Sequence, residues 1–238
     1  MLLMDKPYKD LIRKVGSQSE KPTIKIFNDE IIVGGYQKFT INKKTKKIKF
    51  NVKKKKFDYI DKLIGILNLK YKCQSIVDIG CNSGLTSLIA LNNNFKYICS
   101  LDHDPEYIST LNSIKKLCDI KIINESIYSF GDIINKNFDV VFCGAIIHWI
   151  FSLTSNFRNF DNIIIYLLSI TNKFLVIEWV DPNDNAIKFF NHIKKRAKDG
   201  DEEYNNINFE KSLKKYVKII SKKNVESITR TIYLLEKI

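Results

Sequence analysis

The chain has few glycines, prolines, histidines and arginines, and it has no long apolar run. No apolar stretch approaches the roughly 20 residues of a membrane-spanning helix, so we expect no membrane partner. The five cysteines are odd in number and never spaced as C-x-x-C, which favours reduced core thiols over disulfides or a metal site. Charges early in the chain argue against a secretory signal, and we expect a cytoplasmic protein.

Two common glycine motifs of nucleotide-binding loops are also missing. The chain contains neither G-x-x-x-x-G-K-[ST] nor G-x-G-x-x-G. Instead, residues 75–91, SIVDIGCNSGLTSLIAL, predict a buried strand that ends at Asp78, a turn with Gly80 and Gly84, and an apolar helix. Because parallel α/β sheets bind ligands at the carboxyl ends of their strands, this turn is predicted to bind a cofactor without cradling a pyrophosphate.

A second acid lies at the end of the next predicted strand. Residues 97–111 predict a strand that ends at Asp102 and a helix that Pro105 opens. A carboxylate in this place can accept hydrogen bonds from both hydroxyls of a ribose. We expect Asp104 to cap the helix, which leaves Asp102 for a ligand; the alternative is that either acid merely caps the helix.

Two further strands follow. The third, within residues 119–130, ends near Asn124 and Glu125; Glu125 and Ser126 either contact a ligand or belong to a solvated turn. The fourth, residues 138–143, is almost continuously apolar, as expected of a strand buried on both faces, and Gly144 interrupts it.

Chemically useful side chains come after the fourth strand and within the fifth. A neutral imidazole at His148 can take a proton from a hydroxyl group, although His148 is equally a candidate for a structural histidine packed beside Trp149. The fifth strand, within residues 173–184, ends in Glu178 and Trp179. Glu178 is a candidate to orient His148, to bind a metal or to accept a substrate hydrogen bond; no metal-binding spacing is present, and we predict no metal.

The Asp78 to Gly84 spacing resembles motif I of class I S-adenosylmethionine-dependent methyltransferases. Five strand–helix units, a short helix at 209–215 and two strands within 217–238 repeat the order of that family, so the resemblance covers about residues 58–238. It implies a Rossmann-like α/β fold, with a mostly parallel seven-stranded sheet closed by an antiparallel C-terminal hairpin. It also implies S-adenosylmethionine as cofactor, with the acid near its amine, Asp102 on the ribose and Glu125 near the adenine. The predicted cofactor-binding residues are Asp78, Gly80, Cys81, Asn82, Gly84, Asp102, His103, Glu125 and Ser126.

The resemblance implies an enzyme, and missing motifs exclude some classes of methyl acceptor. The chain has no N-P-P-[YF] tetrapeptide for amino groups of bases and no Pro-Cys pair for pyrimidine C5. We therefore predict O-methylation, with His148 as general base, Glu178 as a second catalytic residue, and Trp149 and Trp179 as substrate contacts. Residues 146–152 and 176–182 also resemble a nodulation-type methyltransferase group, which implies a saccharide or other small acceptor.

Positive charge suggests a second kind of partner. The net charge is +13, and nine lysines lie within residues 43–56. Residues 1–57 are predicted to form a basic N-terminal extension with short strands at 23–52 and an amphipathic helix within 1–20, before the methyltransferase domain at 58–238. Lys53 and Lys55 are its predicted contacts to RNA or another polyanion. A solvated surface, codon bias, and an inactive RNA-binding or scaffold protein are the alternatives, since only four basic residues are arginines.

Overall fold

The computed structural model describes residues 21–126, 136–154, 157–198 and 201–238. The helix predicted within residues 1–20 lies outside these ranges. The chain forms two compact units, one within residues 13–127 and the other from residue 128 onward. Among the described helices, none combines the length and apolar character needed to cross a membrane.

The first unit begins with a small antiparallel sheet in the order β1-β2-β3-β4. Its strands confirm the expected short strands. A helix, α2 (Lys54–Leu69), follows, and the boundary predicted between residues 57 and 58 falls inside it. The four strands are β1 (Thr23–Phe27), β2 (Glu30–Gly34), β3 (Phe39–Asn42) and β4 (Ile48–Phe50).

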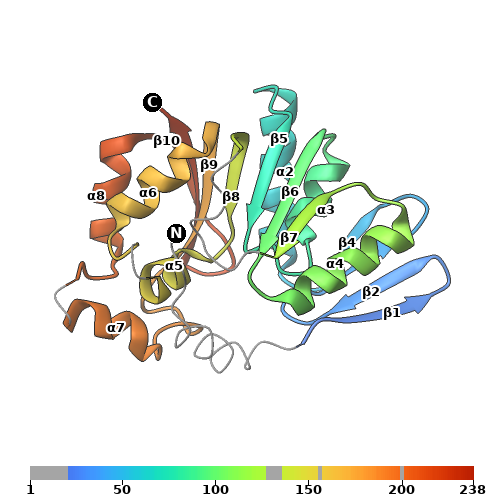
Figure 1. Ribbon diagram of the computed structural model, residues 1–238, viewed down its shortest axis with the longest axis horizontal. Coiled ribbons are helices and arrows are strands. Elements are labelled where there is room, and N and C mark those ends of the chain that lie inside the picture. Colours follow the sequence, from blue (N-terminus) through green and yellow to red (C-terminus); the bar gives the residue numbers. More distant parts are fainter. Residues whose placement is uncertain (1–20, 127–135, 155–156, 199–200) are drawn as a thin grey trace. The chain divides into compact units, whose positions relative to one another are not determined.

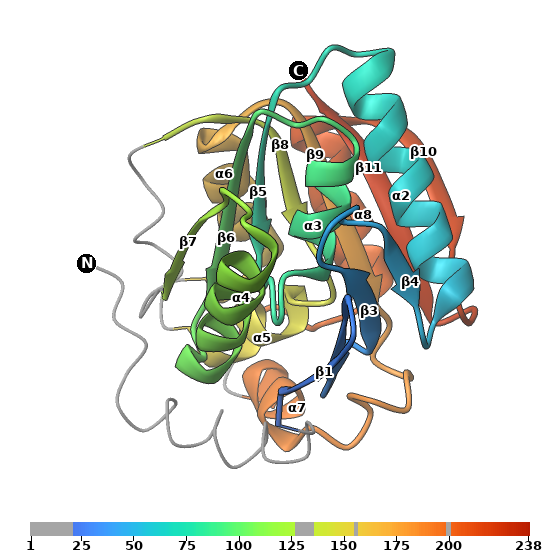
Figure 2. The same cartoon turned by 90° about the vertical axis from the view of Figure 1, so that its right-hand side faces the viewer.

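Three parallel strands, β5-β6-β7, form the rest of the first unit. Both crossovers run in the same direction along the sheet, and right-handed crossovers therefore place α3 and α4 on one face. Figure 2 shows α4 in front of β6. The elements are β5 (Ser75–Ile79), α3 (Leu85–Asn92), β6 (Tyr97–Asp102), α4 (Pro105–Cys118) and β7 (Ile123–Ser126).

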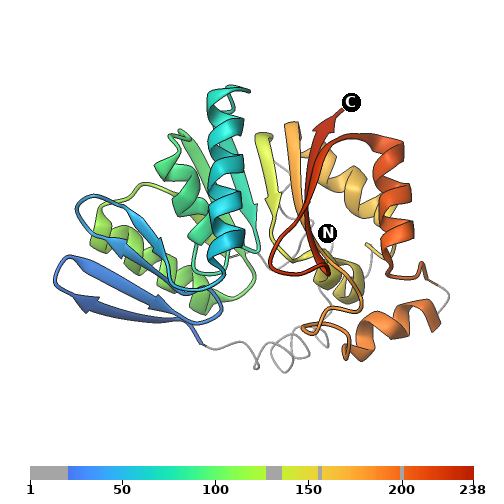
Figure 3. The ribbon, with the colours of Figure 1, turned by 180° about the vertical axis from the view of Figure 1, so that it is seen from behind.

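The second unit has four strands in the order β10-β11-β9-β8. Strands β8 and β9 are parallel, whereas β11 runs antiparallel to both β9 and β10, which confirms the predicted C-terminal hairpin. Figure 3 shows this hairpin from behind, and Figure 1 shows α6 beside α8. The elements are β8 (Phe138–Cys143), α5 (Ile147–Leu153), α6 (Phe160–Ser169), β9 (Thr171–Val180), α7 (Asn191–Lys198), α8 (Asn206–Tyr216), β10 (Val217–Asn224) and β11 (Arg230–Lys237).

Together these strands match the predicted fold class. Among strands β5 to β11, the pairs β5–β6, β6–β7 and β8–β9 are parallel, and the antiparallel pairs β10–β11 and β11–β9 both involve the C-terminal strand β11. The parallel pairs are connected through helices, as the βαβ rule requires. The predicted Rossmann-like α/β fold is therefore confirmed.

Candidate active site

The turn after β5, residues 80–85, is called here the cofactor loop. Three of its residues have positive φ angles: 74° at Gly80, 54° at Asn82 and 84° at Gly84. Glycine adopts this left-handed region without a Cβ penalty, and asparagine tolerates it better than most residues. The loop is consequently a tight coil that leads straight into α3.

Every backbone amide of the cofactor loop donates a hydrogen bond within the protein. A pyrophosphate at a helix N-terminus is held by amides that are free to donate to it. Residues 80–85 have no free amide of this kind. The geometry therefore agrees with the prediction that this turn does not cradle a pyrophosphate. The acceptors are Leu101 O for Gly80 (2.8 Å) and Cys81 (3.0 Å), Asp102 Oδ2 for Asn82 (2.8 Å), Asn82 Oδ1 for Ser83 (3.0 Å), Cys81 O for Gly84 (2.9 Å) and Gln37 Oε1 for Leu85 (3.1 Å).

Asp102 braces the cofactor loop from the end of β6. Its Oδ2 accepts from Asn82 N, its Oδ1 accepts from Asp104 N at 2.9 Å, and His103 Nδ1 lies 3.3 Å from that Oδ1. A carboxylate has about four lone-pair sites, so Asp102 keeps acceptor capacity for a ligand. Asp104 caps α4 as predicted, because its Oδ1 accepts from Glu106 N.

Asp78 lies buried beneath the cofactor loop. Its Oδ2 accepts from Ser87 Oγ at 2.8 Å, and Ser87 Oγ accepts from Ser100 Oγ at 2.6 Å. Burial raises the pKa of Asp78 to about 7, opposed by the Ser87 hydrogen bond and assisted by the charge of Asp102. A positively charged ligand would favour the ionised form of this carboxyl group.

Gly84 and Cys81 serve packing beneath the loop. A Cβ on Gly84 would lie 2.5 Å from Leu111 Cδ1, closer than carbon atoms approach. Cys81 is buried with Ile108 and Leu111, and burial raises the pKa of its thiol well above the usual range. Both residues were predicted to contact the cofactor; the structure gives each of them a packing role.

Glu125 and Ser126 end β7 at the same edge of the sheet. In the parallel register, Glu125 is the partner of Leu101 and Ser126 the partner of Asp102. This register brings the third strand end beside the second one. Their contact with the adenine side of the cofactor stays a prediction.

Sequence reasoning missed two polar residues at this site. Gln37, in the turn between β2 and β3, hydrogen-bonds Cys81 O and Leu85 N. The buried Ser83 hydroxyl has no hydrogen-bond partner among the described residues. The one available signal was Gly84 itself, which cannot cap α3 with a side chain and so leaves that end of the helix to another residue.

In the second unit, α5 buries His148. Its Nδ1 has no hydrogen-bond partner among the described residues. Burial, together with the charges of Arg230 and His192, lowers the pKa of His148 to about 3. The imidazole is therefore neutral at physiological pH.

His148 belongs to a ring cluster formed with Trp149, Phe190 and His192. Ring centroids lie 5.2 Å apart for His148 and Trp149, 5.1 Å for Trp149 and Phe190, and 5.5 Å for the stacked pair of Trp149 and His192. Ser152 Oγ donates to His148 O, so it accepts from His192 Nδ1 at 2.8 Å. Trp149 is only half-buried, as a substrate contact requires, but Phe190 and His192 were not predicted beside it.

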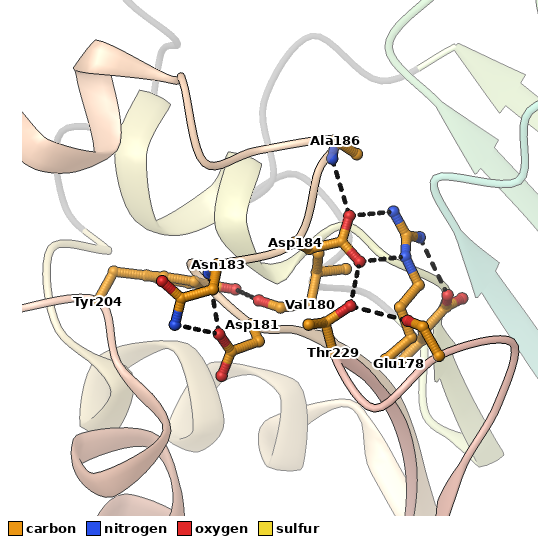
Figure 4. A network of polar contacts seen from close by, with 10 residues as sticks. Glu178, Val180, Asp181, Asn183, Asp184, Ala186, Tyr204 and Thr229 are labelled. Atoms are coloured by element: carbon orange, nitrogen blue, oxygen red, sulfur yellow. Dashed lines mark hydrogen bonds and ion pairs between the residues drawn. The ribbon is translucent and has the colours of Figure 1, made fainter.

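Glu178 has a structural partner in Arg230. Figure 4 shows Glu178 and Asp184 within one network of polar contacts. Its Oε1 lies 3.3 Å from Arg230 Nη1, and Arg230 also donates to both oxygens of Asp184, at 3.0 and 3.1 Å. Burial alone would raise the pKa of Asp184, but hydrogen bonds from Arg230, Ala186 and Thr229 lower it to about 2. Glu178 was predicted to act in catalysis, and the structure instead places it in a buried ion-pair network.

Trp179 lies in the core of the second unit. It is 2% exposed and stacks with Tyr204 at 4.6 Å and with Phe209 at 4.3 Å between ring centroids. Successive strand residues point to opposite faces, so Trp179 lies on the face of β9 opposite Glu178. Trp179 was predicted to contact substrate, and its position is that of a core residue.

The predicted lysine contacts differ in their surroundings. Lys53 begins α2 with its Nζ 4.8 Å from the centroid of the Tyr36 ring, and Lys55 is exposed. Several neighbours in the lysine-rich segment contact the protein itself: Lys44 pairs with Asp29 at 2.7 Å, and Lys46 Nζ donates to Lys43 O and Cys118 O. Lys44 and Lys46 therefore direct their charge to partners within the first unit.

Comparisons with known proteins agree with this geometry. A family model described as a methyltransferase domain matches residues 77–165. No curated protein matches the sequence. Similar solved structures include magnesium protoporphyrin IX methyltransferase from Synechocystis with bound S-adenosylmethionine (11% identity, 80% of this chain and 86% of that chain, TM-score 0.55). The N-methyltransferase NodS from Bradyrhizobium japonicum (10%, 76% and 86%, 0.54) and the 16S rRNA methylase RmtB (14%, 78% and 64%, 0.54) are others.

The resemblance predicted from the sequence is thereby confirmed. Residues 77–165 match the methyltransferase-domain model, and the fold of the chain is that of class I S-adenosylmethionine-dependent methyltransferases. S-adenosylmethionine, the predicted cofactor, is bound in one of the similar structures, and its product S-adenosylhomocysteine is bound in another.

Gly84→Ala is expected to lower the free energy of unfolding by about 2–4 kcal/mol, because the new Cβ meets Leu111 and the residue must keep a positive φ. Urea unfolding measures this loss. In a double-mutant cycle, Leu111→Ala should relieve the clash but not the backbone strain, giving a favourable coupling energy. Unchanged stability in Gly84→Ala would show that the loop is built differently.

Arg230→Met is expected to cost about 3–5 kcal/mol at pH 7, because it leaves Glu178 and Asp184 buried without their cation. The pKa of Asp184 is lower in the folded state than in the unfolded state, so its contribution is present above about pH 4 and is lost toward pH 2. The penalty should therefore shrink on acidification, as followed by denaturant unfolding at several pH values. Arg158→Met is the matched control: it breaks the pair of the half-exposed Arg158 with Asp201 at 3.7 Å and should cost less than about 1 kcal/mol.

Proposed function

We propose that this protein is an S-adenosylmethionine-dependent O-methyltransferase whose acceptor is a small molecule or saccharide. When bound, the cofactor supplies an electrophilic methyl group on a positively charged sulfur. The observation that carries the cofactor assignment is the internally hydrogen-bonded cofactor loop above one buried carboxyl group and beside another. Such a site suits a cationic ligand better than a polyphosphate.

The first unit offers hydrogen-bond acceptors that suit the hydrogen-bond donors of S-adenosylmethionine. Asp102 keeps lone-pair sites for ribose hydroxyls, and Ser83 Oγ is a buried polar atom without a partner in the described structure. Ionised Asp78 adds negative charge next to the loop. These three residues would hold the cofactor's hydroxyl groups and its positive charge.

In the second unit, we propose that His148 accepts the proton of the acceptor hydroxyl. Its Nδ1 carries no other hydrogen bond from the described residues, and the neutral ring is available at any pH above about 4. The charge of Asp184 favours the imidazolium once the proton has been taken. Half-buried Trp149, Phe190 and His192 supply ring faces on which a flat acceptor or a sugar can stack.

RNA remains a predicted partner rather than the proposed acceptor. Its support is the net charge of +13 and the exposed lysines Lys47, Lys49 and Lys55. The internal contacts of Lys44 and Lys46 reduce the charge available to a phosphate backbone. A cytoplasmic location likewise stays a prediction from the sequence.

Asp102→Ala is expected to weaken S-adenosylmethionine binding at least tenfold in calorimetry, because it removes both the ribose acceptor and the brace on Asn82. Asp104→Ala is the matched control in the same turn. It removes the cap on α4 and should cost about 1 kcal/mol of stability while leaving affinity within twofold. Equal affinity of the two variants, or no binding by the unmodified protein at millimolar cofactor, would refute the site.

His148→Gln is expected to reduce methyl transfer about 10²–10⁴-fold without changing cofactor affinity, because it removes the proton acceptor. Transfer from radiolabelled S-adenosylmethionine to a panel of saccharides, phenols and RNA measures this effect and identifies the acceptor class. Full turnover in the variant would assign His148 a structural role.

The same variant tests the titration of His148. The pKa of the buried ring lies near 3, below the ordinary histidine value of 6.5, so the unfolded chain binds the proton first and His148 makes stability fall as pH drops from about 7 to 4. That fall should be smaller in His148→Gln. Direct NMR titration should find the His148 ring neutral from pH 5 to 8.

A further inference from the structure

Gln37 links the small antiparallel sheet to the cofactor loop. Its Nε2 donates to Cys81 O at 3.3 Å, and its Oε1 accepts from Leu85 N at 3.1 Å. These contacts join residues 44 and 48 positions apart in the sequence. Figure 2 shows the sheet that carries Gln37, with β3 close to α3.

The turn that carries Gln37, residues 35–38, is itself held in place. Before it, Gly34 lies against β1, where a Cβ would come within 2.4 Å of Thr23 Oγ1. Gly35 has a φ of 109°, which glycine adopts without strain. After it, Lys38 O accepts from Asn51 N at 3.1 Å. Gln37 therefore extends from a fixed support rather than from a loose loop.

The two hydrogen bonds fix both ends of the cofactor loop. Leu85 is the first residue of α3, and the amides of the first turn of an α-helix have no acceptor within the helix. Gln37 supplies the missing acceptor. Its amide nitrogen meanwhile holds Cys81 O, which also accepts from Gly84 N and so closes the turn. One side-chain amide thus spans residues 81–85.

We propose that Gln37 is a positioning residue for the cofactor, and that the small sheet of residues 23–50 is a structural part of the S-adenosylmethionine site. The proposal rests on the assignment of the cofactor loop made above. Without the brace, the loop samples conformations that do not bind, and affinity falls by the fraction of molecules that remain competent. Gln37 acts through the loop and need not touch the cofactor.

The test compares three variants by calorimetry with S-adenosylhomocysteine. Gln37→Ala should bind roughly tenfold more weakly than the unmodified protein, since both contacts are lost. Gln37→Glu keeps an acceptor for Leu85 N but has no donor for Cys81 O, and it should lie between the two. Asn51→Ala is the matched control: it removes the bond from Asn51 Nδ2 to Thr40 Oγ1 (3.0 Å) in the same sheet and should leave affinity within twofold.

A second measurement separates this proposal from the assignment of the cofactor. Hydrogen exchange of the Leu85 amide in the free protein should speed up at least tenfold in Gln37→Ala but not in Asn51→Ala. If the unmodified protein binds no cofactor while this exchange pattern holds, the functional assignment fails and the brace stands. If Gln37→Ala binds and exchanges as Asn51→Ala does, the brace is refuted.

Discussion

The hydrogen bonds accepted by the carboxylate of Asp102 hold the cofactor site together. One oxygen accepts a hydrogen bond from the Asn82 amide in the turn after β5, and the other accepts one from the Asp104 amide in the turn after β6. Two neighbouring strand ends are thereby fixed to each other by a single side chain. The positive φ of Asn82 and the shape of the whole cofactor loop depend on this contact, because buried amides require acceptors.

Buried carboxyl groups organise the two units in opposite ways. In the first unit, Asp78 accepts a hydrogen bond from the Ser87 hydroxyl, and burial raises its pKa to about 7. In the second unit, Arg230 pairs with two acids, and the pKa of Asp184 is lowered to about 2. An acid without a cation in its neighbourhood is suited to meet a positively charged ligand, whereas an acid that already has one is suited to hold strands in place.

The sequence predicted local features well and distant partners poorly. Strand β8 was predicted to the residue because its apolar run is continuous, and Asp104 was predicted as a cap because capping depends on neighbouring residues. Glu178 looked catalytic because its partner, Arg230, is 52 positions away in the sequence. Gln37 carries no pattern of its own, since its role depends entirely on contacts made after folding.

Arg230 also sets the order in which the second unit can fold during synthesis. Glu178 and Asp184 are synthesised 52 and 46 residues before Arg230, the cation that pairs with them. Until β11 has been synthesised and has paired with β9, both acids must stay in water, and β9 cannot bury its charged face. The second unit can therefore complete its core only after the last strand has been synthesised. Until then β9 is an open sheet edge, and such edges are prone to aggregation.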